Sequence, residues 1–144
     1  MRPDPTILAF DTSAAHCAAT LLQGGEIVAA RHEEMQKGQA ERLFPMLDEV
    51  LDEAENSWSD LDGIGVGTGP GNFTGIRIAV SAARGLALSL GVPAVGVNLF
   101  DALAAGTDGN LLLTLGAPRE AFYVQTRIGS ETSEISVRDI SDLP

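Results

Sequence analysis

The amino-acid sequence predicts a layered α/β domain, in which helices pack against a mixed sheet. Three observations lead to this fold class: two strand-like runs joined by Gly24-Gly25, later apolar runs that alternate with helical segments, and a glycine-rich turn from Gly67 to Arg77. Paired glycines between strand-like runs favour a tight hairpin. Strands separated by helices pair in parallel through right-handed crossovers. We therefore expect an antiparallel start followed by parallel strands.

The individual segments follow one another in the order of such a domain. Short apolar runs bounded by glycine or polar residues predict strands, and apolar residues three or four apart predict helices. Pro45 lies inside the first helical segment and removes a backbone hydrogen bond, so that helix should begin late or kink. The expected strands are residues 6–10, 15–22, 26–31, 61–66 and 94–97, and the expected helices are residues 39–55, 76–90 and 99–105.

The residues beyond 106 are expected to form a smaller, separate part. Thr107 to Asn110 are four turn-forming residues and mark a linker. Strand-like runs follow at residues 111–115, 122–128 and 135–137. The expected organisation is one domain at residues 1–106 and a small sheet extension at residues 107–144.

Length and charge limit the class of protein. The 144 residues suffice for one core and fall short of two full lobes. Nine Lys and Arg against 20 Asp and Glu give a formal net charge of −11. Because affinity for nucleic acid comes largely from Lys and Arg that neutralise phosphates, we expect no direct binding of RNA or DNA.

The sequence also predicts a soluble, cytoplasmic protein. The lone cysteine, Cys17, cannot form an internal disulfide, and the first residues lack the apolar core of a signal peptide. The longest apolar segment, residues 76–90, is interrupted by Arg77 and Arg84, so no membrane span is expected.

The glycine turn lacks both common phosphate-binding signatures, because neither Gly-Lys-Ser/Thr nor Gly-x-Gly-x-x-Gly occurs in it. Backbone amides at the start of the following helix could hold an anion. Tight glycine turns also serve for packing alone, and the two interpretations are equally open. Asp and hydroxyl residues after the first strand could position a magnesium-bound phosphate, although they are also ordinary turn residues. The candidate nucleotide or phosphate residues are Asp11, Thr12, Ser13, Gly69 and Gly71.

The helix after the glycine turn is apolar around almost its whole circumference. Arg77, Ser81 and Arg84 form a single thin polar line on it. One sheet face covers one side only, so the other side needs another helix or another protein chain. Either the helix at residues 39–55 covers it, or both helices together form an interface.

No catalytic or metal-binding constellation is recognisable. His16 and His32 lack carboxylates or cysteines at ligand spacing, which predicts surface or hydrogen-bonded residues. Cys17 lies in an apolar run and is expected to be a small buried hydrophobe. Since no Ser/His/Asp arrangement stands out either, peptidase activity is not expected.

Two segments together resemble the TsaB (YeaZ) family: Ile7 to Ser13, and the run Gly-x-Gly-Pro-Gly-x-Phe-Thr-Gly-x-Arg at Gly67 to Arg77. The resemblance implies an actin-like, RNase H-type lobe with a mixed sheet and flanking helices. It also implies a role in making the threonylcarbamoyladenosine modification of tRNA at position 37. Members of the family are non-catalytic subunits that pair with the related catalytic protein TsaD, and the TsaE ATPase joins them.

In this family the helices that correspond to residues 74–90 and 39–55 form the interface with TsaD, or with a second copy in a homodimer. One of the two substitutions Ala79→Glu and Ala83→Glu is therefore expected to abolish pairing while the isolated chain stays folded. The interface residues that the resemblance implies are Leu43, Leu47, Leu51, Phe73, Thr74, Arg77, Ala79, Val80, Ala83 and Arg84.

The chain departs from the catalytic relatives and from the family pattern. The catalytic relatives bind a metal through His-x-x-x-His at the start of the first long helix, where this chain has Gln39 and Leu43. We expect no cofactor bound by this chain alone, and ATP and magnesium only in the assembled complex. The stretch Gly116 to Tyr123 replaces the usual start of the second lobe, which predicts a truncated or degenerate lobe.

The alternative function is an ATP-dependent phosphotransferase or ATPase of the actin-like superfamily, which would need two lobes around the nucleotide.

Overall fold

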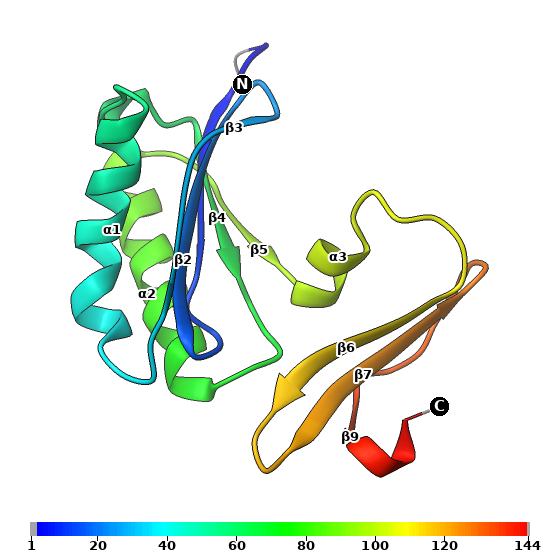
Figure 1. Ribbon diagram of the computed structural model, residues 1–144. Helices are drawn as coiled ribbons and strands as arrows, with labels where there is room; N and C mark the ends of the chain where they lie inside the picture. Colours follow the sequence, from blue (N-terminus) through cyan, green and yellow to red (C-terminus); the bar gives the residue numbers. More distant parts are fainter. Residues whose placement is uncertain (1–2, 144) are drawn as a thin grey trace. The chain divides into compact units, whose positions relative to one another are not determined.

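The chain folds as two compact units, the first ending at Val97 and the second beginning at Asn98. The computed structural model, shown in Figure 1, describes residues 3–143. The division lies before helix α3 (Leu99–Ala104), whereas the turn residues Thr107 to Asn110 had indicated a boundary after it. Helix α3 stays with the second unit because it contacts the strand that follows it, and because Asp101 pairs with Arg127 at 2.6 Å.

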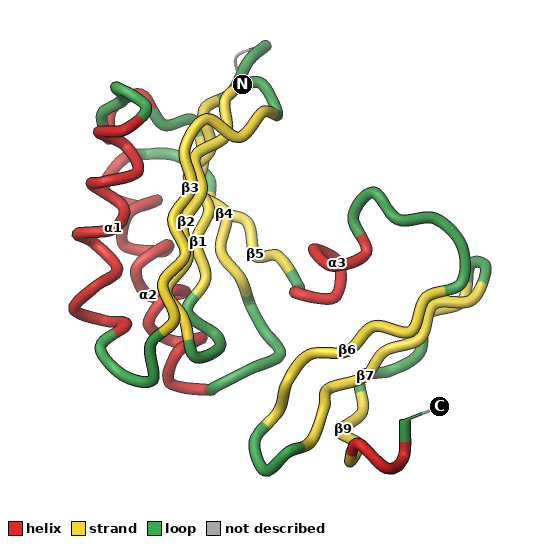
Figure 2. Tube along the Cα trace, in the orientation of Figure 1, coloured by secondary structure: helices red, strands yellow, loops and turns green. Residues whose placement is uncertain are grey.

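The first unit is a five-stranded mixed sheet with two helices on one face (Figures 1 and 2). The strand order is β3-β2-β1-β4-β5, in which β1, β2 and β3 are antiparallel neighbours and β4 runs parallel to both β1 and β5. This arrangement confirms the expected mixed sheet. The strands are β1 (Thr6–Asp11), β2 (His16–Gln23), β3 (Glu26–Glu34), β4 (Gly63–Gly67) and β5 (Ala94–Val97), and the helices are α1 (Gln39–Glu53) and α2 (Phe73–Leu90).

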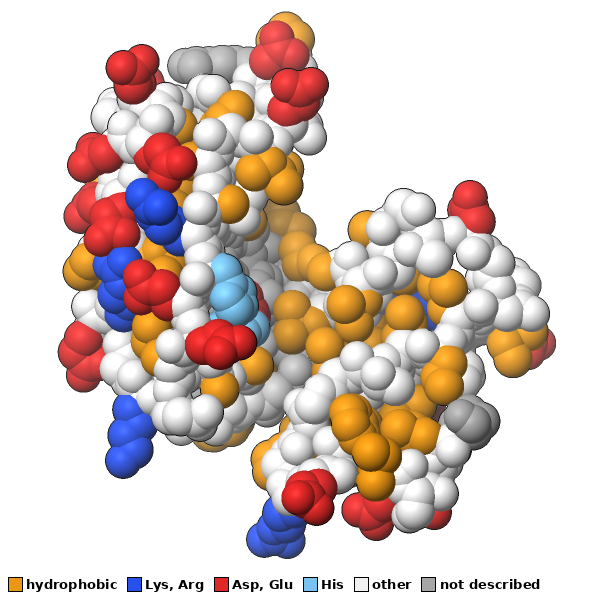
Figure 3. Space-filling view, in the orientation of Figure 1, with side chains coloured by type: hydrophobic (Ala, Val, Ile, Leu, Met, Phe, Trp, Pro, Cys, Tyr) orange, Lys and Arg blue, Asp and Glu red, His pale blue; other side chains and the backbone are white. Residues whose placement is uncertain are grey.

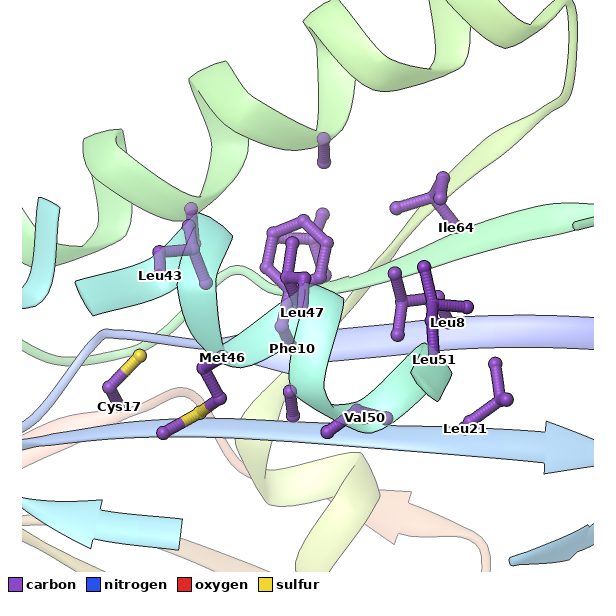
Figure 4. Packing of buried hydrophobic residues seen from close by; sticks show 14 of the residues in the cluster. Leu8, Phe10, Cys17, Leu21, Leu43, Met46, Leu47, Val50, Leu51 and Ile64 are labelled. Atoms are coloured by element: carbon purple, nitrogen blue, oxygen red, sulfur yellow. The ribbon is translucent and has the colours of Figure 1, made fainter. Parts of the chain in front are cut away.

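The core of the first unit lies between the sheet and these helices, as Figure 4 shows. Helix α1 packs over β2 and β3, and its apolar stripe faces the buried side chains of the sheet, among them Leu8, Phe10 and Leu21. The helix begins at Gln39 and runs through Pro45, so it does not begin late. A short 3-10 helix, Trp58–Asp60, leads from α1 to β4. The core residues of α1 are Leu43, Met46, Leu47, Val50 and Leu51.

The second unit is a small antiparallel sheet, in agreement with the strand-like runs in its sequence. Strands β6, β8 and β9 all pair with β7. Leu113 of β6 and Val124 of β7 are buried. The elements are β6 (Leu111–Ala117), β7 (Ala121–Ile128), β8 (Glu131–Thr132), β9 (Ser136–Asp139) and a 3-10 helix at Ile140–Asp142.

A close approach between two turns fixes the start of α2. The backbone N–H of Asn72 donates to the carbonyl of Ser13 (2.6 Å), and the Thr12 hydroxyl donates to the carbonyl of Gly75 (2.5 Å). A Cβ atom on Gly71 would overlap the Ser13 carbonyl oxygen, and one on Gly75 would overlap the Thr12 carbonyl oxygen. Glycine is therefore required at both positions by space, because the neighbouring atoms belong to the backbone and cannot swing aside.

Truncating a core leucine of α1 tests the packing. Leu47→Ala is expected to lower the free energy of unfolding by about 2–5 kcal/mol, because it removes buried methyl groups and leaves a cavity. Urea denaturation measures this change. The matched control is Leu88→Ala on the outer side of α2, where the leucine is exposed; it should stay within about 0.5 kcal/mol. Equal losses in both variants would contradict the described core.

Two glycines of one helix test the close approach. Gly75→Ala is expected to destabilise the chain by about 1–3 kcal/mol, because the new methyl group meets the Thr12 backbone. Gly85→Ala adds the same methyl group to α2 where no other atom lies within 4 Å, and it should stabilise by up to about 1 kcal/mol through helix propensity. Thermal unfolding of the two variants should therefore shift in opposite directions, and a shared direction would argue against the contact.

Candidate functional site

The polar residues at the end of β1 hydrogen-bond mainly to one another. Asp11 Oδ2 accepts hydrogen bonds from the hydroxyl and the backbone N–H of Ser13, at 2.9 and 3.3 Å, and lies 2.6 Å from His16 Nε2. Thr12 and Ser13 are buried. The Thr12 hydroxyl is directed to Gly75 on α2. Both hydroxyls that were candidates for a phosphate thus have partners within the chain, and phosphate binding by them stays a prediction.

The second carboxylate oxygen of Asp11 differs from the first. Among the described residues, Asp11 Oδ1 is the buried side-chain oxygen for which no hydrogen-bond partner is found. A Cβ atom on Gly67 would overlap it, so the glycine at the end of β4 makes room for this carboxylate. The oxygen therefore lies at the junction of β1, β4 and the glycine turn.

The pairing of His16 with Asp11 does not follow from ligand spacing along the chain, because the two residues meet across the turn from β1 to β2. Asp11 is directly opposite Ala18, and His16 has the same parity as Ala18. Side chains alternate between the faces of a strand, so this parity places His16 on the face of Asp11 and is the signal that could have revealed the contact.

The glycine turn itself serves packing. Gly69 has φ +86°, in the left-handed region that favours glycine. Gly71 leaves space for the Ser13 carbonyl. Asn72 caps α2, because its side-chain oxygen accepts the Gly75 N–H at 2.9 Å. These contacts favour the packing interpretation, and anion binding at Gly69 and Gly71 stays a prediction.

Half of the expected interface residues prove to be core residues of this chain. They lie on the faces of α1 and α2 that point to the sheet, and none is more than 2% exposed. A Glu at position 79 or 83 would bury a charge in that core, so we now expect such a variant to lose stability as well as pairing. The buried residues are Leu43, Leu47, Leu51, Ala79 and Ala83, and their part in an interface stays a prediction.

The other five residues of the expected interface are accessible to solvent or half-buried. Phe73 is 72% exposed, and the Arg77 guanidinium lies 5.2 Å from the centre of its ring. Thr74 and Arg84 are exposed as well, and Val80 is half-buried. All five belong to α2, so this helix supplies the accessible part of the expected interface.

Helix α2 is not covered on its outer side by α1. Leu88 is 87% exposed. The two helices instead border an open groove of about 620 Å³. Of the two alternatives for the outer side of α2, full cover by α1 is therefore wrong for the described residues, because α1 covers one flank only, and cover by another chain stays a prediction. The groove is lined by Ala40, Leu43, Phe44, Ile78, Ser81, Ala82, Gly85, Leu86 and Ser89.

By length and composition alone, α2 is apolar enough to cross a membrane, contrary to the expectation for this segment. A core helix of a soluble protein passes the same test, and one such helix is weak evidence for a membrane span. Ala79 and Ala83 of α2 pack into the core of the first unit. The helix is thus a core element on its inner side.

Gln39 and Leu43 stand where the resemblance places the metal-binding histidines of the catalytic relatives. Gln39 Nε2 donates a hydrogen bond to the carbonyl of Met35 at 3.2 Å. Within residues 3–143, no group of three or more His, Cys, Asp and Glu residues is arranged to hold a metal ion. Cys17 is buried, as predicted, and this burial raises the pKa of its thiol.

The sequence matches the family model described as "TsaD: tRNA N6-adenosine threonylcarbamoyltransferase" over residues 25–144. It is 36% identical over 100 residues to the tRNA threonylcarbamoyladenosine biosynthesis protein TsaB of Escherichia coli (strain K12), covering 69% of this chain and 43% of that protein. TsaB of Bacillus subtilis (strain 168) is also 36% identical over 100 residues, which cover 69% of this chain and 44% of that protein. The chain thus spans less than half the length of these relatives.

Solved structures agree with these matches. YeaZ from Pseudomonas aeruginosa superimposes with a TM-score of 0.78 at 29% identity, over 97% of this chain and 70% of that chain. The ROK hexokinase from Thermus thermophilus superimposes with a TM-score of 0.55 at 20% identity, over 89% of this chain and 48% of that chain. This similarity concerns the fold alone. The fold is that of the actin-like ATPases, and the chain belongs to the TsaD family, as a member of its TsaB (YeaZ) group.

Proposed function

We propose that this protein is a non-catalytic scaffold or activating subunit in tRNA threonylcarbamoyladenosine biosynthesis, and that it pairs with a TsaD-like catalytic subunit through α1 and α2. The observation that carries the proposal is the uncovered apolar side of α2. Phe73 and Leu88, near the two ends of α2, are largely exposed, and Phe44, Ile78 and Leu86 line the groove between α1 and α2. Exposed apolar surface and grooves of this kind mark protein–protein contacts. The proposal is supported by the relatives named TsaB and by the match to the TsaD family model.

A partner with the same fold suits this surface. A related chain would present a corresponding pair of helices, and two such pairs bury each other's apolar sides in one helical layer. A TsaE-like ATPase joins the pair in this proposal. A homodimer through the same face is the competing assembly.

The proposed division of labour assigns the chemistry and the RNA contacts to the partners. The net charge of −11 disfavours binding of tRNA by this chain. Thr12 and Ser13 hold the turns together through their hydroxyls, and Gln39 and Leu43 do not supply metal ligands. ATP and magnesium therefore enter with the assembled complex, in the cytoplasm.

One observation favours the alternative, an ATPase or phosphotransferase of the actin-like superfamily. The buried Asp11 Oδ1 faces the glycine turn without a described partner. A carboxylate oxygen in this position is suited to a hydrated magnesium ion on a nucleotide phosphate. The alternative differs from the main proposal in requiring nucleotide binding by this chain alone.

Changing one exposed leucine tests the proposed pairing. Leu88→Glu is expected to raise the dissociation constant for the TsaD of the same organism at least about tenfold, because it places a charge in an apolar contact. Size-exclusion chromatography and interferometry measure the pairing. The control is Ile27→Glu on β3, an exposed apolar residue away from the helices, which should pair as the unchanged chain does. Separate elution of the unchanged, folded chain and TsaD would refute the proposal.

Titration calorimetry with ATP and magnesium separates the two functions. The isolated chain is expected to give no heat of binding, because the hydroxyls of Thr12 and Ser13 are engaged. Saturable binding that Asp11→Asn abolishes, with the variant still folded, would instead establish the nucleotide-binding alternative.

A further inference from the structure

Gly85 lies on the exposed side of α2, in the wall of the groove between α1 and α2. We propose that a helix of the partner makes its closest approach to this chain at Gly85 and seats an apolar side chain in the groove. We also propose that this helix directs basic groups toward α1. The inference rests on the proposed function and adds to it the contact point and the chemistry of the partner's helix.

Within residues 3–143, no contact accounts for a glycine at position 85. Glycine is, after proline, the least favourable residue in a helix interior. Gly85 has helical neighbours on both sides, and a Cβ atom added there would meet no atom within 4 Å. Gly75 of the same helix differs, because the Thr12 backbone leaves no room for a side chain. The requirement at Gly85 therefore points outside the chain.

The surroundings of Gly85 fit a helix more closely than a flat surface. Ser81, Ala82 and Ser89 line the groove beside it, and Phe44 of α1 lines it from the other helix. Small side chains let two helices approach with their axes about 8–10 Å apart. The groove of about 620 Å³ then accepts one or two large apolar side chains of the partner.

Charges on the two helices orient the occupant. Glu41, Phe44 and Asp48 are exposed and three or four residues apart, so they form one row on α1. The space-filling view shows many acidic side chains over α1, with a few basic ones among them (Figure 3). Arg42 does not offset that row, because its guanidinium is bound to Glu33 and Glu49 at 2.6 and 2.7 Å.

Helix α2 carries the opposite charge on its exposed side. Arg77 and Arg84 lie seven residues apart and are exposed. Complementary charges across an interface set the orientation of the partner. A helix in the groove should therefore carry Lys or Arg toward α1 and acidic side chains toward α2, with its apolar stripe between them.

A size series at Gly85 tests the contact point. In the isolated chain, Gly85→Ala should raise the melting temperature by about 2–4 °C. Despite this gain, it should weaken pairing with the same organism's TsaD about fivefold, and Gly85→Leu about fiftyfold or more, because each side chain holds the two helices apart. The control is Gly116→Ala on β6 of the second unit, which also adds a methyl group where no neighbouring residue lies within 4 Å and should leave pairing unchanged.

Charge reversal tests the orientation in the same assay. Glu41→Lys and Arg84→Glu should each weaken pairing about tenfold at low salt, with smaller effects at high salt, because the lost attraction is screened. If the unchanged chain pairs with TsaD and both Gly85 variants pair equally well, the inference is overturned and the proposed function stands. If the unchanged chain does not pair at all, both are overturned. Stronger binding of Glu41→Lys would overturn the assignment of basic groups toward α1.

Discussion

The structure of the first unit depends on the contact between the turn after β1 and the first turn of α2. Thr12 meets Gly75 twice there: its hydroxyl donates to the Gly75 carbonyl, and its own carbonyl oxygen lies where a Cβ atom on residue 75 would stand. A helix is stiff, so fixing its first turn also fixes which of its faces points to the sheet. Ala79 and Ala83 follow Gly75 at intervals of four residues and lie on the inner face. Gly85 is rotated by roughly 200° from Ala83 and so points outward.

The same contact explains why the polar residues after β1 hydrogen-bond within the chain. A site for a nucleotide phosphate needs hydroxyls and amides that are free to bind it. In this chain the Thr12 hydroxyl bonds to α2, and the Ser13 hydroxyl bonds to Asp11. The Thr12–Gly75 hydrogen bond, with the one from the Asn72 N–H to the Ser13 carbonyl, holds the two turns at a distance that only glycines allow. The Thr12 hydroxyl thus serves the geometry of α2, and phosphate binding by this segment stays a prediction.

The elements could be predicted from the sequence because their signals are local: Gly24-Gly25 marks the hairpin, and the apolar stripe of α1 marks its buried face. The two faces of α2 could not be told apart, since Ala79, Ala83 and Gly85 are all small and only the Thr12 contact decides which ones are buried. The pairing of His16 with Asp11 required the register of β1 and β2. The unit boundary was displaced for a similar reason, because the Asp101–Arg127 pair joins α3 to the second unit across many residues.

The exposed apolar side of α2 has to be reconciled with a strongly acidic chain. Apolar surface of this kind promotes association, whereas a net charge of −11 repels a second copy of the same chain. The acidic row on α1 adds to this repulsion where it meets the same row of a second copy. A partner with basic groups next to its apolar stripe gains the same burial without that repulsion. The charge distribution thus favours a different chain over a second copy as the occupant of the groove, and it does so most strongly at low salt, where charges are least screened.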